Sequence, residues 1–488
     1  MNASGIFYLL VMLLLYSLNS KAEVILPKIL GNNMVLQRDV PVPVWGTAAI
    51  GEKVVVTFAN QTKTVLTDQS GQWKIVLDPM PASAHPQTLT ISGTNTIKLD
   101  NILVGEVWLC SGQSNMQYEM RKNSKVAKPD TSTVNSPVDE LGRAHNPEIR
   151  IFLATQKNLG KPDSTHSGWN IAEGTALRDF SAAGYFFGKN LSHDLKVPVG
   201  IISSAVSGSR IEPWASLEAF NSINYFKANN IKIDGDPGKF YHKMIEPLAP
   251  FAIRGFLWYQ GESNCFLGES ISYTYKMEAL INCWRQLWRN DKMPFYYVQI
   301  APYYYSKAKG IMPYTEEREP EFREAQTIAL KIPHTGMIVT TDLNDDLNNI
   351  HPPFKWVVGQ RLELLALAKT YGEHNIVFSG PEYKAMKIKR NKIILSFDSA
   401  DGGLVSHDGK SLNNFTIAGS DGKFYNADAV IKGDKVIVSS PEVASPTTVR
   451  FAWNEAAQPN FYNKGGLPAV PFRTDNPLKF SYTNTDLK

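Results

Sequence analysis

A serine stands at a point where a strand is expected to turn into a helix. The apolar run 107–110 is followed by Ser111-Gly112-Gln113-Ser114-Asn115-Met116. A glycine-containing turn of this kind exposes a serine hydroxyl at the carboxyl end of a sheet, and the serine N–H, near a helix start, can help to hold an oxyanion. Met116 replaces the last glycine of the usual Gly-x-Ser-x-Gly elbow. From the residues alone, Ser114 is either a nucleophile or a helix N-cap.

A histidine is the second candidate, because a serine needs a base to become a nucleophile at neutral pH. His351 follows the expected strand 336–341 and the acidic loop 342–350, and it precedes two prolines and a helical pattern. This order places the imidazole at the same sheet edge as Ser114, with carboxylates nearby to orient it. The alternative role for His351 is that of a surface or helix-cap residue.

Two more strand ends carry small and polar residues. The loop after the strand 200–204 contains Gly208, and the strand that ends at Tyr259 continues into Gln260-Gly261-Glu262-Ser263-Asn264. Such loops supply backbone and side-chain N–H donors. A single loop glycine is more often structural, but four such clusters at the strand ends of one sheet together predict a site.

Strand-like and helical patterns alternate through the middle of the chain. The expected strands are 107–110, 149–153, 200–204, 253–259, 295–300 and 336–341, and the expected helices are 183–195, 273–289, 321–331 and 354–370. This alternation predicts an α/β domain, a parallel sheet with helices on both faces. Ligands of such sheets bind beyond the carboxyl ends of the strands, where the four clusters lie.

The flanks of this core have a β pattern, with short β-type runs separated by turn residues. We therefore expect an N-terminal β-sandwich-like domain over 23–103, an α/β domain over 104–372 and a C-terminal β-sandwich-like domain over 373–488. The 488 residues suffice for about three domains. The net charge of +4 is too small to indicate nucleic-acid binding.

The first residues predict export. The stretch 6–18 is almost wholly apolar, and polar residues and then Ala22 follow it. A stretch this short is typical of a secretory signal peptide, here covering 1–22, with cleavage after Ala22. The alternative is an uncleaved membrane anchor, but a span needs about 20 apolar residues. The mature protein is expected to be periplasmic or extracellular and free of the membrane, and its oligomeric state stays open.

Three cysteines fit neither a disulfide scaffold nor a Cys-x-x-Cys metal site. Cys110 lies in an apolar run and is expected to be a buried small hydrophobe. A bridge between Cys265 and Cys283 is left open. No cluster of metal-ligand residues is visible, and we expect neither a metal nor another cofactor.

The order of the motifs resembles that of the SGNH-hydrolase superfamily and, more narrowly, that of the sialate O-acetylesterase family of carbohydrate esterases. The resemblance covers nearly the whole mature chain, including both β flanks. It is carried by Gly112-Gln-Ser-Asn-Met116, Trp258-Tyr-Gln-Gly-Glu-Ser-Asn264, Ile350-His-Pro352 and, near the end of the chain, Phe461-Tyr-Asn-Lys-Gly-Gly-Leu467 and Pro471-Phe-Arg-Thr474.

The resemblance implies an SGNH-type parallel sheet and a role for each matching residue. Ser114 matches the family nucleophile and His351 the family base. The oxyanion hole would be formed by the Ser114 and Gly208 N–H groups and the side-chain amide of Gln260. Two supporting residues, Glu262 and Asn264, would organise the loop that follows Tyr259. The implied reaction passes through an acetyl-enzyme that water hydrolyses.

One departure concerns the group that orients the base. Many SGNH enzymes have an aspartate three residues before the histidine, and Asn348 stands there in this chain. We favour Asp342 as the third catalytic residue, because it closes the expected strand. The alternatives are Asp345, or a Ser-His dyad helped by a carbonyl group or by Asn348.

The leading hypothesis is thus an exported serine esterase that removes O-acetyl groups from a carbohydrate substrate, with sialate esters first. An acetylxylan or other hemicellulose esterase is the alternative within the class, and a catalytically inactive carbohydrate-binding protein is the alternative outside it. Aromatic residues at strand ends either pack against sugar or lie inside the protein. They are Trp214, Trp258, Tyr259 and Tyr303-Tyr304-Tyr305.

Overall fold

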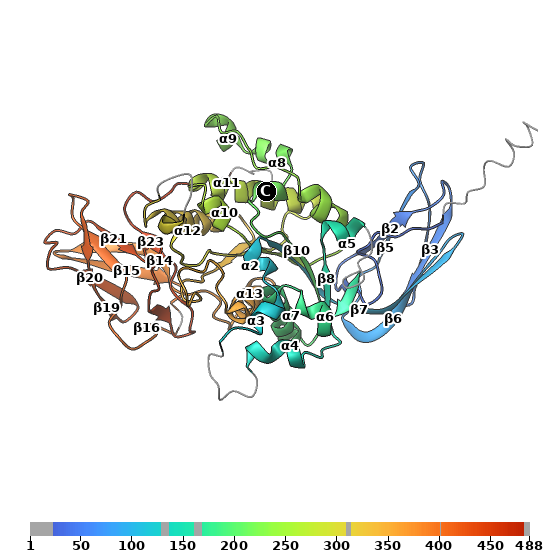
Figure 1. Ribbon diagram of the computed structural model, residues 1–488, viewed down its shortest axis with the longest axis horizontal. Coiled ribbons are helices and arrows are strands. Elements are labelled where there is room, and N and C mark those ends of the chain that lie inside the picture. The colour runs from blue at the N-terminus through green and yellow to red at the C-terminus, as the bar shows by residue number, and fades with distance from the viewer. Residues whose placement is uncertain (1–22, 128–135, 161–167, 309–313, 401, 483–488) are drawn as a thin grey trace, which may run out of the picture.

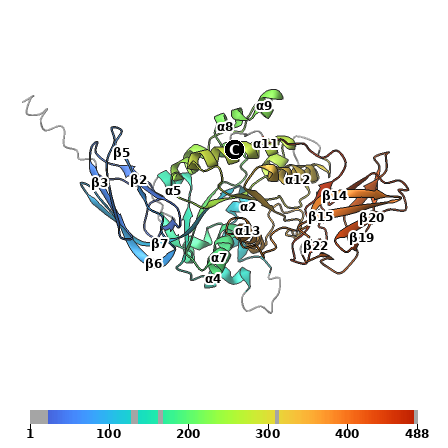
Figure 2. The ribbon, with the colours of Figure 1, turned by 180° about the vertical axis from the view of Figure 1, so that it is seen from behind.

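Three regions follow one another along the long axis of the molecule (Figure 1). The structure is a computed structural model that describes residues 23–127, 136–160, 168–308, 314–400 and 402–482. The N-terminal strands lie at one end, the α/β core lies in the middle, and the C-terminal strands lie at the other end, and the same order is visible from behind (Figure 2). The expected signal peptide lies outside the described residues.

The core sheet has the order β13-β12-β11-β7-β10-β8-β9. Every neighbouring pair is parallel except β8 and β9, which are antiparallel. Long apolar runs form these strands because a sheet covered on both faces buries both sets of side chains. The strands are β7 (Thr96–Gly112), β8 (Ile149–Leu153), β9 (Trp169–Ile171), β10 (Val199–Ala205), β11 (Gly255–Tyr259), β12 (Phe295–Val298) and β13 (Thr335–Ile338). The predicted α/β sheet is confirmed.

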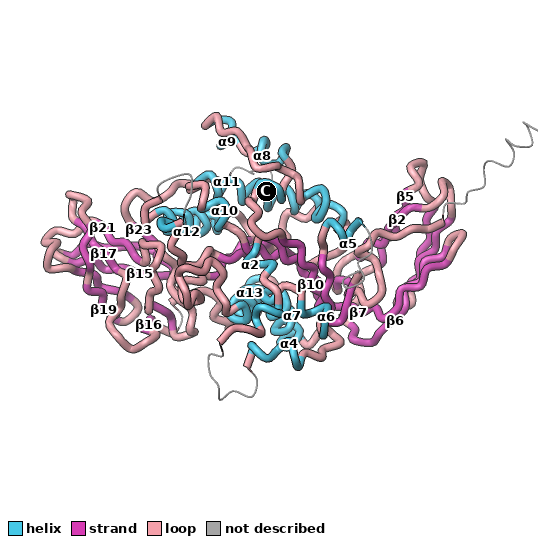
Figure 3. Tube along the Cα trace, in the orientation of Figure 1, coloured by secondary structure: helices cyan, strands magenta, loops and turns pink. Residues whose placement is uncertain are grey.

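Helices cover both faces of this sheet (Figure 3). Successive strand residues point to opposite faces, so Trp108 packs on Phe187 of α7, with ring centroids 5.3 Å apart, and Trp258 packs on Trp284 of α11 at 5.8 Å. The long helices are α7 (Ala182–Leu195), α11 (Ile271–Trp288), α12 (Arg318–Ile328) and α13 (Lys355–Lys369). Shorter helices connect them: α2 (Ser114–Gln117), α3 (Met120–Asn123), α4 (Glu140–Arg143), α5 (Gln156–Gly160), α6 (Gly174–Arg178), α8 (Leu217–Ser222), α9 (Asn224–Ala228) and α10 (Glu262–Cys265).

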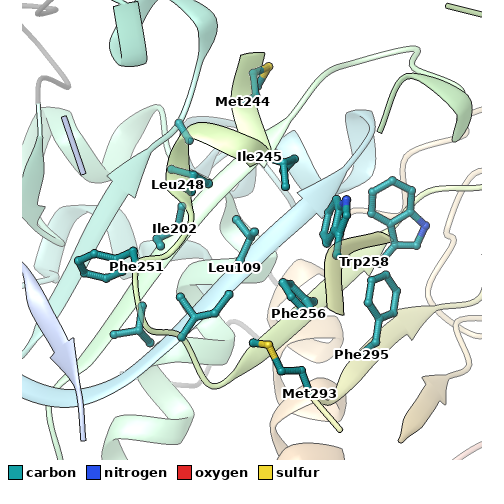
Figure 4. Close-up of a cluster of buried hydrophobic side chains, with 14 of the residues drawn as sticks. Leu109, Ile202, Met244, Ile245, Leu248, Phe251, Phe256, Trp258, Met293 and Phe295 are labelled. Atoms are coloured by element: carbon teal, nitrogen blue, oxygen red, sulfur yellow. The ribbon is translucent and has the colours of Figure 1, made fainter. Parts of the chain in front are cut away.

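An apolar cluster on the α11 face of the sheet sets the strands side by side (Figure 4). Its strand residues are Leu109, Ile202, Phe256, Trp258 and Phe295, and residues 244–251 cover them. All five strand side chains are almost fully buried. Each such side chain stabilises the fold by about 1.5–3 kcal/mol. This packing brings the carboxyl ends of four neighbouring strands to one edge.

The strand β7 belongs to two regions. Its first half pairs with β6 and β1, and its second half pairs with β10 and β11 in the core sheet. The domain boundary expected between residues 103 and 104 therefore falls inside one strand. The other N-terminal strands are β1 (Val35–Gln37), β2 (Val42–Thr47), β3 (Lys53–Phe58), β4 (Gln61–Leu66), β5 (Gln72–Leu77) and β6 (Ser83–Ser92).

A buried carboxylate joins the N-terminal region to the core. Glu106 of β7 is fully buried and accepts hydrogen bonds from Arg38 Nε at 2.6 Å, Arg254 Nε at 2.8 Å and the Tyr371 hydroxyl at 2.9 Å. Burial opposes its charge, but these donors outweigh burial and lower the pKa of Glu106. The charged form therefore holds three segments together.

Two antiparallel four-stranded sheets build the C-terminal region. One has the order β14-β15-β20-β19 and the other β18-β17-β21-β23, and a buried apolar cluster lies between them. The predicted β-sandwich-like domain is confirmed. The strands are β14 (Glu382–Lys389), β15 (Lys392–Asp398), β16 (Leu404–Ser406), β17 (Phe415–Ala418), β18 (Phe424–Asn426), β19 (Asp428–Lys432), β20 (Lys435–Ser439), β21 (Thr448–Phe451), β22 (Phe461–Asn463) and β23 (Phe472–Arg473).

The cysteines Cys110, Cys265 and Cys283 are all buried and unbridged, so the bridge that the sequence left open is absent. Over the described ranges, no helix has both the length and the hydropathy that crossing a bilayer requires.

Candidate functional site

The first part of the site is the turn from β7 into α2. Gly112 has a φ of +138°, and a Cβ atom there would lie 2.2 Å from the carbonyl oxygen of Tyr259. The Gln113 N–H donates to that same carbonyl at 3.0 Å. Because the turn lies directly on β11, a side chain at position 112 does not fit. Ser114 begins α2 at the carboxyl edge of the sheet and is half-buried.

The loop after β10 lies beside this turn. The Ser207 N–H donates to Gln117 Oε1, in the same helix as Ser114, at 2.8 Å. Gly208 follows with a φ of +71° and is exposed. Among the described residues its N–H makes no hydrogen bond. That N–H is therefore available next to α2.

The loop after β11 supports the loop after β10. Gln260 is fully buried, and its Nε2 donates to Asn264 Oδ1 at 2.7 Å and to the Ser209 carbonyl at 3.2 Å. Asn264 Oδ1 also accepts the Ile211 N–H at 3.0 Å. Both amide protons of Gln260 are thus used inside the protein. The structure gives Gln260, like Asn264, a supporting position under the Gly208 loop rather than the oxyanion contact expected from the sequence.

Asn115 connects the segments that carry Ser114 and His351. Its Nδ2 donates to Glu262 Oε1 at 2.5 Å and to the Ile350 carbonyl at 3.1 Å, and its Oδ1 accepts from Lys355 Nζ at 2.6 Å. Ser114 directly precedes Asn115, and His351 directly follows Ile350. The two segments, far apart in the sequence, therefore meet at one edge of the sheet.

His351 is half-buried, and its environment keeps the imidazole neutral. Burial, then the charge of Lys355, then that of Lys122 lower the pKa of His351 to about 4. Its backbone N–H donates to Asn349 Oδ1 at 3.0 Å. The imidazole itself has no hydrogen bond to any residue that the structure describes. A neutral imidazole with a free nitrogen can accept a proton.

The acidic loop does not place a carboxylate on His351. Asp342 makes a bidentate ion pair with Arg361 of α13, Nη1–Oδ1 2.8 Å and Nη2–Oδ2 2.5 Å. Asn348 Nδ2 donates to Asp346 Oδ1 at 3.1 Å, and Asp345 acts on Tyr118, whose pKa is raised mainly by burial. The preference for Asp342 as third catalytic residue is corrected here, because a guanidinium binds both carboxylate oxygens at once.

The loop that carries His351 is braced from several sides. Asn344 Nδ2 donates to the Pro302 carbonyl at 2.7 Å and to the Asn349 carbonyl at 2.9 Å. Gln458 of the C-terminal region donates from Nε2 to the Asn344 carbonyl. The C-terminal region thus helps to hold the segment of the candidate base in place.

Most strand-end aromatics lie inside the protein. Trp214, Trp258 and Tyr259 are fully buried, and Tyr305 is nearly so. Only Tyr303 and Tyr304 of the set are half-exposed. The interpretation of the three fully buried rings as sugar platforms is wrong, because they pack between the sheet and its helices.

Sequence reasoning missed Asn115 and Lys355 as parts of the site. Both are fully buried polar residues. A lysine four positions after a candidate base, where a helix begins, was a possible signal for Lys355. No signal in the sequence shows that Asn115 would face it.

Removal of the Asp342 charge tests the ion pair. We expect Asp342→Asn to destabilise the protein by roughly 1.5–3 kcal/mol, because it weakens charge-assisted hydrogen bonds to Arg361. The kcat is expected to fall less than tenfold, since Asp342 does not contact His351. Urea unfolding and ester hydrolysis measure the two effects. A loss of kcat near 10⁴-fold with unchanged stability would restore Asp342 as the orienting carboxylate.

The chain is similar to known carbohydrate esterases. The family profile "Carbohydrate esterase, sialic acid-specific acetylesterase" matches residues 104–362. The human sialate O-acetylesterase is 29% identical over 408 residues, 75% of each chain, and the rat protein of that name is 28% identical over 440 residues, 75% of this chain and 78% of its own.

A solved structure extends the similarity to the β regions. The carbohydrate acetylesterase from Xanthomonas citri is 34% identical with a TM-score of 0.81, and the match covers 93% of this chain and 100% of that one. The family profile spans more than half of the 488 residues and contains the segments of Ser114, Gly208, Gln260 and His351. The chain therefore belongs to the sialic acid-specific acetylesterase family of carbohydrate esterases and is a carboxylic ester hydrolase.

Proposed function

We propose that this protein removes O-acetyl groups from carbohydrates, with Ser114 as nucleophile and His351 as general base. The observation that carries the proposal is the hydrogen bond from Asn115 Nδ2 to the Ile350 carbonyl, at 3.1 Å. It joins the residue after Ser114 to the residue before His351. A contact of this kind brings together the two segments that carry the proposed nucleophile and base, and acyl transfer requires that these segments meet.

In the proposed mechanism His351 takes the proton of the Ser114 hydroxyl while Ser114 Oγ attacks the acetyl carbonyl. The negative charge on the carbonyl oxygen is stabilised by the N–H groups of Ser114 and Gly208. His351 then gives its proton to the sugar oxygen, which leaves as the alcohol. Water, deprotonated by His351, attacks the acetyl-enzyme, and acetate and the free serine result.

We propose further that the two residues act as a dyad. The structure binds Asp342 to Arg361, and no carboxylate is hydrogen-bonded to the imidazole in the described part of the chain. The braced loop around Asn344 and Asn349 would then orient the ring through its backbone. This arrangement costs some stabilisation of the imidazolium, which a carboxylate would otherwise provide.

The pH dependence of the reaction follows from the lowered pKa of His351. The base acts in its neutral form, which persists on acidification until the pH approaches about 4. We expect kcat/KM to stay nearly constant from pH 7 down to about pH 5 and to fall below that. A pH series with p-nitrophenyl acetate measures it. An acid limb centred at the ordinary histidine value, 6.5, would contradict the environment described for His351.

For the substrate we propose O-acetylated sialic acid first. The family profile and the human and rat relatives support this choice. The similarity to the Xanthomonas citri carbohydrate acetylesterase over 93% of this chain supports a wider second class of substrate, other acetylated carbohydrates, and acetylated xylan is the member of that class that we propose to test. Acetate release from O-acetylated sialic acid and from acetylated xylan, compared at equal ester concentration, decides between them. Equal rates on both would defeat the narrower assignment.

Export remains a proposal that rests on the apolar stretch 6–18 and the small residue Ala22. Expression of the full chain with its natural start, followed by mass spectrometry of the mature protein, tests it. A mature N-terminus at Glu23 supports cleavage after Ala22. Retention of residues 1–22 would contradict it.

A further inference from the structure

A buried lysine lies beneath the site without a carboxylate partner. Lys355, in the first turn of α13, is fully buried. No carboxylate oxygen within the described ranges lies at salt-bridge distance from its Nζ; its hydrogen bond goes to Asn115 Oδ1 at 2.6 Å. An ammonium group costs several kcal/mol to bury, and a methionine would fill the same space at no such cost. A charge kept there at a cost indicates a function.

Two aromatic rings complete the surroundings of this ammonium group. Lys355 Nζ lies 5.0 Å from the centroid of the Tyr118 ring and 4.8 Å from that of the Tyr259 ring. Aromatic faces stabilise a cation without accepting its proton. The position of Nζ is thus set by three groups from three segments: α2, the stretch between α2 and α3, and the end of β11.

The hydrogen bonds of Asn115 leave its amide one orientation. Its oxygen faces the donor Lys355 Nζ, and its nitrogen faces two acceptors, Glu262 Oε1 and the Ile350 carbonyl. Lysine has donors only, so a flipped amide would set nitrogen against nitrogen and oxygen against oxygen. Lys355 therefore specifies, together with these two acceptors, the direction in which Asn115 donates, and that direction includes the bond to the segment of His351.

Residues 350–355 are consequently clamped at both ends by one side chain. Asn115 binds the carbonyl of Ile350 at one end and Nζ of Lys355 at the other. His351 lies between them, and Pro352 and Pro353 stiffen the connection. The clamp fixes the base relative to Ser114, the residue that precedes Asn115.

Lys355 also acts on His351 through its charge. It stands second to burial among the causes that lower the pKa of His351, and Lys122 of α3 comes third. Burial lowers the pKa of Lys355 itself to about 7, against the opposing charge of Glu262. Three other titratable groups surround Nζ: burial raises the pKa of Glu262 and of Tyr259, and it also raises the pKa of Tyr118, on which the charge of Asp345 acts in addition. In the acidic range where His351 titrates, Lys355 carries its full charge.

We propose that Lys355 is a positioning residue of the ester hydrolysis: its ammonium group locks Asn115 in the orientation that ties the Ser114 segment to the His351 segment, and it places a positive charge four residues after the base. This inference rests on the proposed function, since it assumes that Ser114 and His351 react. It assigns Lys355 no contact with the substrate.

Lys355→Met and Lys355→Gln test the two parts of the proposal. Methionine removes both charge and donor, whereas glutamine removes the charge and keeps an N–H donor for Asn115. We expect Lys355→Met to lower kcat on p-nitrophenyl acetate by about 10- to 100-fold with little change in KM. The acid limb of kcat/KM is expected to move to higher pH in both variants, by at least about half a unit. Glutamine should retain more of kcat than methionine.

Lys369→Met is the matched control. Lys369 is the last residue of the same helix and is exposed, with its Nζ donating to the Thr335 carbonyl at 3.3 Å. This substitution should leave kcat and the acid limb unchanged. The melting temperature of each variant shows whether it is folded, and if Lys355→Met fails to fold, Lys355→Gln decides the test.

The outcomes separate this inference from the proposed function. Three results would overturn the role of Lys355. The first is a folded Lys355→Met protein with the kcat and the acid limb of the wild type. The second is an unmoved acid limb in Lys355→Gln, and the third is a loss of kcat in Lys369→Met equal to that in Lys355→Met. Failure of the proposed function gives different results: the wild type itself releases no acetate, or Ser114→Ala is as active as the wild type. The rate at which a fluorophosphonate labels Ser114 measures the effect of the clamp without any sugar substrate. We expect this rate to be lower in Lys355→Met than in the wild type.

Discussion

Ser114→Ala is expected to lower kcat on p-nitrophenyl acetate and on acetylated glycan by about 10⁴- to 10⁶-fold. The acetyl-enzyme cannot form without Oγ, and the oxyanion donors alone retain only a small part of the rate. The fold should not suffer, because the hydroxyl of Ser114 makes no hydrogen bond within the described part of the chain. Initial rates and a melting curve on the same preparation measure both effects.

Ser222→Ala is a suitable control for that experiment, since Ser222 is an exposed serine at the end of α8. It should retain wild-type activity. The nucleophile assignment is wrong if Ser114→Ala keeps more than about a tenth of the wild-type kcat. Electrospray mass analysis after mixing with substrate adds a direct readout, because only the wild type should carry one acetyl group.

His351→Gln is expected to lower kcat by about 10³- to 10⁴-fold. Glutamine has nearly the size of histidine and can form hydrogen bonds, but it does not exchange a proton near neutral pH. The loss therefore measures proton transfer and not the shape of the site. The residual activity should also lose the acid limb near pH 4, because the group that titrates there is gone.

The comparison variant is His374→Gln, in the exposed stretch after α13. It removes a histidine that lies outside the site, and both kcat and the acid limb should stay as in the wild type. Should His351→Gln retain the acid limb, another group titrates there, and the base has to be sought elsewhere in the site.

The sequence allowed the core strands to be predicted because parallel strands buried on both faces are apolar throughout. The strand 149–153 has the same limits in the structure as in the prediction. The strand 336–341 was expected to continue further than β13 does, since Val339 is apolar and buried although it lies beyond the last paired residue. Burial and strand pairing are separate properties, and the pattern reports only the first.

The site was predictable as far as the segments of the chain, but not as far as the hydrogen-bond partners. Ser114 and His351 could be placed because strand ends of one parallel sheet meet at one edge. The hydrogen-bond partners of Asp342 and Gln260 could not be predicted, because these partners are distant in the sequence. Arg361 lies 19 positions after Asp342, and the Ser209 carbonyl lies 51 positions before Gln260. Whether a carboxylate binds a guanidinium or an imidazole depends on which side chain lies nearer in space, and spacing along the chain does not contain that information.

The strand shared by the two regions limits how this protein can be shortened. If residues 23–95 were deleted, the first half of β7 would lose its neighbours β1 and β6 and present a row of unpaired N–H and C=O groups. Such a bare edge recruits other chains, so a truncated enzyme should aggregate rather than persist as a minimal catalyst. The N-terminal region is in this respect a protective cover that the hydrolase cannot shed, whether or not it ever touches a sugar.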